Sequence, residues 1–180
     1  RPGYKFDHWS EKVNGAAFNF GHLLDQKLTL YAVWTPNTNT QYTVIHWLEN
    51  ADDDGYSYKE SETQYGTTGE QTSATAKSYT GFTAQTIAQQ TIAGDGSTIV
   101  NVYYKRNVYD VKFYSYSTSG GLWNPGSPSV EYENLRITAK YGANIRDKWP
   151  TYNGSNAWST TDNGSTYQVN IDTMPLNGTN

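Results

Sequence analysis

The strongest constraint on this chain is a repeated pair of strand-like segments. The segments YTVIHWLEN and YDVKFYSY begin at Tyr42 and Tyr109, an offset of 67 residues. Each follows a run of alternating apolar residues, LTLYAVW at 28–34 and TIVNVYYK at 98–105. Alternation with a period of two is typical of a strand that buries one face. We therefore expect a closing strand to end one module just before an opening strand begins the next.

These boundaries divide the chain into three modules. Polar connectors follow the two closing strands, at 35–41 and 105–107. The predicted domains are residues 1–36, the C-terminal half of a module; 37–107, a complete module; and 108–180, a module that lacks its closing strand. Modules of this size bury little apolar surface alone, so packing against neighbouring modules matters.

Turn signals mark strand ends inside these modules. Asp95-Gly96 is a dipeptide typical of tight hairpin turns. Tyr65-Gly66 in the central module and Tyr141-Gly142 in the last are interpreted as corresponding steps. Glycine at such steps indicates a change of chain direction.

The composition favours sheets over helices. Sixteen Tyr and six Trp suit a pleated, half-buried surface, whereas a single Met and few Leu leave little material for helical cores. Charged residues make up 17% of the chain, below the usual level of about 25%. The predicted fold class is mainly β (α+β at most), with little helix.

Charge and cysteine content exclude several functions. A net charge of -4 gives no general attraction to phosphate backbones or anionic membranes, so nucleic acid is not an expected partner. The absence of cysteine excludes disulfides, thiol catalysis and thiolate metal sites. No stretch approaches the roughly 18 apolar residues of a membrane span, and no membrane insertion or targeting segment is expected.

Specific motifs resemble known repeat families. The first segment, with PGYKFDHWS at 2–10 and LTLYAVWT at 28–35, resembles the internalin B-repeat, also called the Listeria/Bacteroides repeat. The last module is similar to the first half of that pattern, but GSNAWS at 154–159 stands where Gly-Tyr-x-Phe belongs. The central module, from YTVIHWLEN to GDGSTIVNVYYKRN, is similar to the mucin-binding-type repeats of Gram-positive surface proteins.

These resemblances imply tandem small β-grasp-like modules, in which a mixed sheet wraps one short helix or a loop that replaces it. They also imply a secreted, cell-wall-attached adhesin on the surface of a Gram-positive bacterium, with attachment through regions outside this sequence. The partners implied are neighbouring repeat modules and, in the adhesive case, host glycans or proteins.

One acidic segment has the beginning of a calcium loop. Asn50, Asp52 and Asp54 place oxygen ligands at the first, third and fifth positions, with Gly55 at the sixth. Ser61 stands at the twelfth position in place of the bidentate Glu, and the flanking segments are predicted strands. The alternative interpretation is a solvated, Asp-rich hairpin turn, and no other cofactor is predicted.

Aromatic side chains are the candidate ligand-binding residues, because their faces stack on sugar rings. The candidates lie in Asn-, Gly- and Pro-rich sequence: Trp123, Trp149, Tyr152 and Trp158. The competing interpretation is packing, which we expect for Trp9 and Trp34. His46 aligns with Phe113 in the repeat register and is predicted to be a core or cross-strand residue.

Two functional hypotheses remain, and neither is enzymatic, since no catalytic constellation can be assembled from these residues. The first is a stalk of spacer modules that presents a distal functional domain of a surface adhesin. The second is an adhesive module that binds mucin glycans or a host surface protein through exposed aromatic residues.

Overall fold

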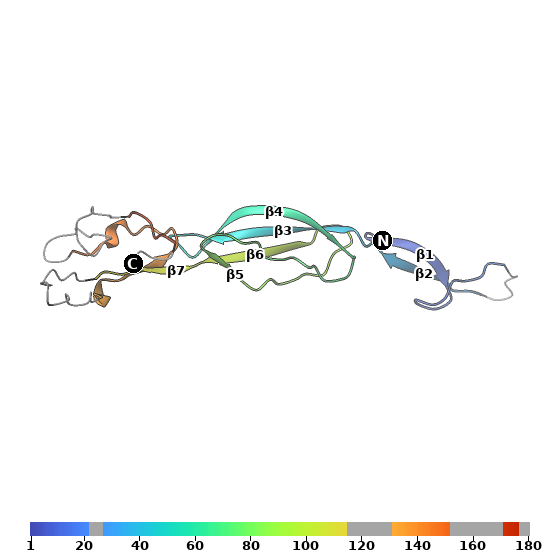
Figure 1. The fold of residues 1–180 in the computed structure, drawn as a ribbon. Coiled ribbons are helices and arrows are strands. Elements are labelled where there is room, and N and C mark those ends of the chain that lie inside the picture. The colour runs from blue at the N-terminus through green and yellow to red at the C-terminus, as the bar shows by residue number, and fades with distance from the viewer. Residues whose placement is uncertain (22–26, 115–130, 152–170, 177–180) are drawn as a thin grey trace, which may run out of the picture. The chain divides into compact units, whose positions relative to one another are not determined.

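The computed structural model describes residues 1–21, 27–114, 131–151 and 171–176 (Figure 1). Strands dominate it, and the mainly β prediction is confirmed. The helical elements in these residues are two short 3₁₀ helices, η1 (Glu133–Leu135) and η2 (Arg146–Lys148). In the same residues no helix is long and apolar enough to cross a membrane.

The chain forms two compact units. The first contains Arg1–Trp47, Tyr58–Lys77 and Gln85–Tyr103, and the second contains Leu48–Ser57, Ser78–Ala84 and Tyr104–Asn180. The strands of the described residues are β1 (Tyr4–Ser10), β2 (Tyr31–Pro36), β3 (Thr40–Glu49), β4 (Tyr56–Gly66), β5 (Phe82–Ala84), β6 (Ile99–Arg106), β7 (Val108–Val111) and β8 (Ile137–Lys140). They form the two-stranded sheets β1-β2 and β7-β8 and a four-stranded sheet in the order β4-β3-β6-β5.

The predicted opening and closing strands of the central module are confirmed as β3 and β6. The closing strand predicted at 28–34 begins later than expected: the regular strand β2 starts at Tyr31. The opening strand predicted from Tyr109 is shorter than expected, since β7 ends at Val111.

The opening and closing strands of the central module lie side by side and run in the same direction. Near their starts, the Thr43 amide donates to the Thr98 carbonyl. At their ends, the Arg106 amide donates to the Glu49 carboxylate at 2.8 Å. Matching starts and matching ends make this a parallel pair. The central sheet is therefore mixed, as the β-grasp expectation requires.

Strict alternation along β3 and β6 builds the core. Tyr42, Val44 and His46 of β3 are fully buried, as are Val100 and Val102 of β6. Residues between them on each strand remain partly or fully exposed. The prediction of His46 as a core residue is confirmed, and its Nε2 lies 3.7 Å from the Glu62 carboxylate.

The second unit has its own apolar core. Val111 and Phe113 from the opening segment pack with Ile137 and Ala139 of β8, and the remaining buried members are Ala143, Ile145 and Met174. Ala51, from the turn between β3 and β4, packs against this cluster although it belongs to the central module in sequence. Central-module residues therefore contribute to burial of the last module.

The burial of two isoleucines predicts that their substitution changes the free energy of unfolding by very different amounts. Ile92 is 2% exposed and Ile99 is 50% exposed. Ile92→Ala should lower the free energy of unfolding by about 2–5 kcal/mol, because it leaves a cavity. Ile99→Ala, the matched control, should change it by less than about 0.5 kcal/mol. Urea denaturation measures both values, and equal effects would contradict this assignment of the core.

Candidate functional site at the linker asparagines

The connector between β2 and β3 is fixed by an asparagine backbone. The amide of Asn37 donates to the Gly3 carbonyl at 2.8 Å, and its carbonyl accepts from the Thr68 amide at 2.9 Å. Gly3 precedes β1, whereas Thr68 follows β4. We call Gly3, Asn37 and Thr68 the first junction, since one peptide segment joins the hairpin β1–β2 to the central module.

The connector between β6 and β7 repeats this arrangement. The amide of Asn107 donates to the Gly81 carbonyl at 2.9 Å, and its carbonyl accepts from the Tyr141 amide at 2.8 Å. Gly81 precedes β5 and Tyr141 follows β8. These three residues are the second junction, and it reproduces the first junction bond for bond.

A glycine is required at the same place in each junction. Gly3 and Gly81 have positive φ angles of 73° and 81°. A Cβ on Gly3 would lie 2.6 Å from the Thr68 hydroxyl and 2.2 Å from the Cα of Gly94. A Cβ on Gly81 would lie 2.2 Å from the Tyr141 ring. Both backbone angle and close approach therefore exclude a larger residue.

The segments beyond the junctions also correspond. The Gly69 amide donates to the Ile92 carbonyl, and the Ile92 amide donates to the Glu70 carbonyl. In the last module, the Gly142 amide donates to the Met174 carbonyl, and the Met174 amide donates to the Ala143 carbonyl. The antiparallel bridge Gln71–Thr91 is matched by Asn144–Thr173. Gly69 and Gly142 have positive φ angles of 86° and 73°. Gly142 therefore corresponds to Gly69, and the prediction that it matches Gly66 was wrong.

The two junctions differ in one residue beside the asparagine. In the first junction the preceding residue is Pro36, and in the second it is Arg106. The Arg106 guanidinium donates from Nε to the Glu49 carbonyl at 2.6 Å and from Nη1 to the Tyr141 carbonyl at 2.7 Å. It also lies over the Phe82 ring, 4.7 Å from its centre. Arg106 thus joins β3, β5 and the residue that follows β8.

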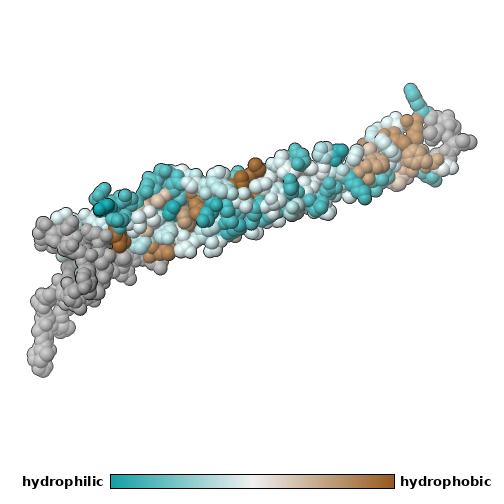
Figure 2. Space-filling model, turned by 90° about the horizontal axis from the view of Figure 1, so that it is seen from above, coloured by the Kyte–Doolittle hydropathy of each residue, from teal (hydrophilic) through white to brown (hydrophobic). Residues whose placement is uncertain are grey.

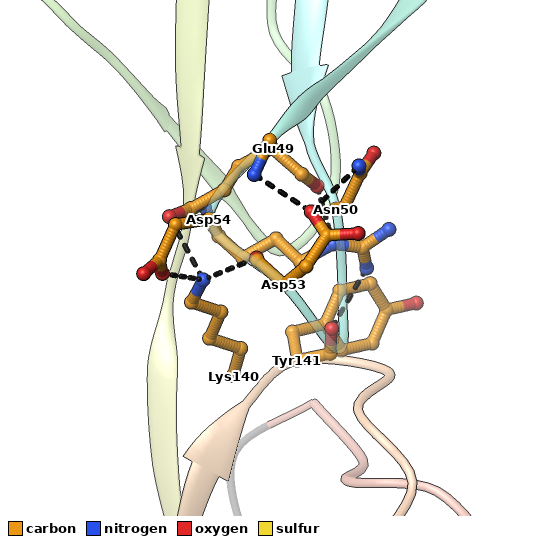
Figure 3. A network of polar contacts seen from close by, with 8 residues as sticks. Glu49, Asn50, Asp53, Asp54, Lys140 and Tyr141 are labelled. Atoms are coloured by element: carbon orange, nitrogen blue, oxygen red, sulfur yellow. Dashed lines mark hydrogen bonds and ion pairs between the residues drawn. The ribbon is translucent and has the colours of Figure 1, made fainter.

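A lysine extends this polar network to the turn between β3 and β4 (Figure 3). The Lys140 ammonium lies 3.0 Å from the buried Glu49 carboxylate and 3.1 Å from Asp54 Oδ1. It also donates to the Asp53 carbonyl at 2.8 Å. Hydrogen bonds to Glu49 and Asp54 raise the pKa of Lys140 above its usual value.

The acidic turn is closed by its own side chains. Asp53 accepts from the Asn50 side-chain amide at 2.8 Å and from the Gly55 amide at 2.6 Å. The Asn50 hydrogen bond is the largest cause that lowers the pKa of Asp53, followed by the Gly55 amide. Asp52 accepts from the Asn144 amide at 2.9 Å. The turn therefore contacts the last module through both Asp52 and Asp54.

These contacts account for the residues predicted as calcium ligands. The Asn50 side chain bonds to Asp53 and accepts from Ser57, while Asp52 and Asp54 face an amide and an ammonium group. An ammonium group beside Asp54 repels a second cation. Among the described residues, no group of three His, Cys, Asp or Glu side chains could hold a metal ion. The contacts are those of an Asp-rich hairpin turn, and the calcium site stays a prediction.

One of the four predicted aromatic ligand residues can be placed. Trp149 lies partly buried against the core of the last module, where its ring meets Phe113 edge to face at 5.5 Å. Its Nε1 donates to the Ile171 carbonyl at 2.9 Å. These contacts are those of a packing residue. Trp123, Tyr152 and Trp158 lie outside the described residues.

A different aromatic group lies on the solvent-facing side of the central sheet. Trp47 stacks on Tyr103 with ring centres 6.4 Å apart, and it meets Tyr58 edge to face at 6.0 Å. Its Nε1 donates to Asn101 Oδ1 at 2.8 Å. Tyr58 and Tyr103 are exposed. We call Trp47, Tyr58, Tyr103 and Asn101 the aromatic row.

Comparison of the chain with protein-family models, curated proteins and solved structures finds no match in any of the three.

The acidic turn predicts a titration at a single amide. The pKa of Asp53 lies below the ordinary 3.8, so its stabilisation is complete above that pH and is lost as pH falls through the lowered pKa. The Gly55 amide resonance should therefore titrate with a midpoint below 3.8. Nuclear magnetic resonance measures this midpoint, and Asp53→Asn should abolish it. A midpoint at or above 3.8 would refute the assigned hydrogen bonds.

Proposed function

We propose that this chain is a non-enzymatic spacer of an extracellular bacterial surface adhesin, in which successive modules hold a distal functional domain away from the cell wall. The observation that carries the proposal is the repetition of one junction at both module boundaries. A spacer needs connections that resist bending, and it needs the same connection at each step.

The length of the connectors supports this proposal. Three residues separate β2 from β3, and a single residue, Asn107, separates β6 from β7. In both connectors the asparagine backbone is bonded on its donor and its acceptor side. Flexible linkers are solvated chains without such bonds. The bonds at Asn37 and Asn107 therefore oppose rotation of one module against the next.

The second junction supports the proposal further, because charged groups strengthen it. Hydrogen bonds that involve a charged group are roughly twice as strong as neutral ones. Arg106 bonds to carbonyls on both sides of the boundary, and Lys140 reaches Glu49 and Asp54 from the last module. The junction resists displacement in more than one direction.

Loss of Arg106 tests the spacer function. The chain has no cysteine, so spin labels can be placed uniquely at Thr80→Cys and Lys148→Cys, both exposed positions of the second unit. We expect a narrow distance distribution in the parent chain and a broad one after Arg106→Ala, measured by electron–electron resonance. Lys105→Ala, an exposed neighbour, is the matched control and should leave the distribution unchanged.

The same variants test how much Arg106 contributes to the stability of the last module. Arg106→Ala should lower the stability of the last module by about 1.5–3 kcal/mol, the range for hydrogen bonds to charged groups. Hydrogen exchange at the Tyr141 amide should accelerate, because that amide closes the junction. A broad distance distribution in the parent chain would overturn the spacer proposal.

The aromatic row supports a second candidate function, adhesion to glycans. Trp47 is held in place by Asn101 and by two neighbouring rings, so its orientation is fixed before any ligand binds. Preorganised ring faces with polar groups at their edges suit the apolar faces and hydroxyls of pyranose sugars. On this candidate, the central module would bind host mucin glycans.

A single tryptophan substitution tests the adhesive function. If the aromatic row binds oligosaccharide, Trp47→Ala should weaken binding by roughly tenfold or more, equivalent to about 1.4 kcal/mol. Tyr65→Ala, an exposed aromatic on β4, is the control and should retain affinity. A glycan array followed by titration calorimetry measures both. No binding by the parent chain would eliminate this candidate.

A further inference from the structure

A pull along the chain reaches the central module at opposite ends of one strand pair. The chain enters this module at Asn37, shortly before β3, and leaves it at Asn107, directly after β6. The strands β3 and β6 are neighbours and run parallel, so their starts lie at the same end of the sheet. Tension between Asn37 and Asn107 therefore draws β3 towards its start and β6 towards its end. The load on this pair is a sliding force along the strands.

Sliding loads the hydrogen bonds between the two strands together. The bonds of a parallel pair are evenly spaced along the strands. A displacement along the strands lengthens all of them at once, whereas a displacement across the strands breaks the bond at one end first. A single backbone hydrogen bond contributes little net stability. A strand pair therefore resists tension best when its bonds carry the load together.

Side chains add further connections along the same strand pair. Trp47 of β3 donates from Nε1 to Asn101 Oδ1 of β6 at 2.8 Å. The Trp47 ring also stacks on Tyr103, with ring centres 6.4 Å apart. At the ends of both strands, the Arg106 amide donates to the Glu49 carboxylate at 2.8 Å. Each contact crosses from one strand to the other and opposes their sliding.

Apolar side chains exclude water from the inner face of this strand pair. Val44 of β3 and Val100 and Val102 of β6 are all 0% exposed. Figure 2 shows mainly hydrophilic and intermediate colours along the middle of the view, where Figure 1 shows β3, β4 and β6. A hydrogen bond is stronger in surroundings of low dielectric constant, where water does not compete for its donor and acceptor. The core therefore protects the bonds that carry the load.

The hairpin β1–β2 provides the opposite geometry. Its strands are antiparallel, and Lys5 lies opposite Thr35. A force between these two residues pulls across the strands and separates the residue pairs one after another. Water also reaches this hairpin, since Trp9 is 44% exposed in the described residues. Our expectation that Trp9 fills a core is not met there.

We propose that the central module bears tension, because the parallel pair β3–β6 is loaded in shear. This function goes beyond that of a spacer, which requires resistance to bending but no resistance to a pull along the chain. Such a load arises when one side of the module is anchored and the other side is bound to a moving surface. Forced unfolding is governed by the rate of unfolding. The resistance of the module therefore depends on the direction of the pull.

Pulling one module in two directions tests the proposal. Because the chain has no cysteine, DNA handles for optical tweezers can be attached at chosen cysteine pairs. Handles at the exposed positions Thr38→Cys and Lys105→Cys pull along the strands, whereas handles at Thr38→Cys and the exposed Ser97→Cys pull across their starts. We expect the first pair to require a several-fold higher unfolding force than the second. The gain in length, set by the number of residues between the handles, identifies the unfolding of this module.

The antiparallel hairpin supplies a second reference for the same measurement. Handles at Lys5→Cys and Thr35→Cys, both exposed and directly opposite each other, pull across β1 and β2. The hairpin should open at a force well below that needed to pull β3 and β6 along their length.

A pair of matched substitutions separates resistance to tension from ordinary stability. Asn101→Ala removes the bond to Trp47 between β3 and β6, and Gln71→Ala removes a bond of the same kind to Thr91 outside this pair. Both bonds join exposed side chains, at 2.8 and 2.9 Å. Urea denaturation should therefore show similar losses of stability for the two variants. Only Asn101→Ala should lower the unfolding force along the strands.

Two outcomes would overturn the proposal. One is an unfolding force along the strands that is no higher than the force across them. The other is a force for Asn101→Ala that is no lower than that for Gln71→Ala. Either result leaves the spacer function intact, because that function is tested by the width of the distance distribution at the second junction. A broad distribution together with a high force along the strands would instead eliminate the spacer and retain the tension-bearing module.

Discussion

The backbone of one asparagine per boundary is the interaction on which this structure depends. The backbone amide and carbonyl of Asn37 bond to different modules, and so do those of Asn107. The donor side reaches a glycine that begins a hairpin, and the acceptor side reaches the residue before a second turn glycine. These hydrogen bonds join backbone groups only, so the residue that donates to the asparagine carbonyl can be Thr68 in the first junction and Tyr141 in the second.

Side chains then give each junction its own strength. Pro36 donates nothing at the first boundary, whereas Arg106 at the corresponding position bonds to Glu49 and Tyr141. Glu49 is buried, so its charge requires partners, and it has the Arg106 amide and the Lys140 ammonium. Removing one cation would leave a buried carboxylate short of compensation. The polar network of the second unit is therefore interdependent.

Local sequence patterns predicted much of the fold. Contacts between residues that are distant in the sequence could not be predicted in this way. Alternation indicated β3 and β6, because a period of two is visible among neighbouring residues. The 67-residue repeat register, which aligns His46 with Phe113, indicated the buried His46. The partners Lys140 and Asp54 lie 86 residues apart, and no local pattern joins them. Alignment of the closing strands at Asn37 and Asn107 was available in the sequence and would have indicated the junctions. Matching the dipeptides Tyr65-Gly66 and Tyr141-Gly142 was misleading, because backbone angle and not residue type defines the turn.

The acidic turn shows how one sequence pattern can serve two kinds of chemistry. Oxygen atoms at alternate positions suit a calcium ion, but they suit a hairpin turn beside a lysine equally well. In this chain Asp53, which the calcium pattern leaves unused, closes the turn by accepting from Asn50 and Gly55. Lys140 then supplies, from the last module, the positive charge that the carboxylates require. A bound calcium ion and the Lys140 ammonium would thus occupy the same place beside the oxygens of this turn. The ammonium has the advantage that it belongs to the same chain.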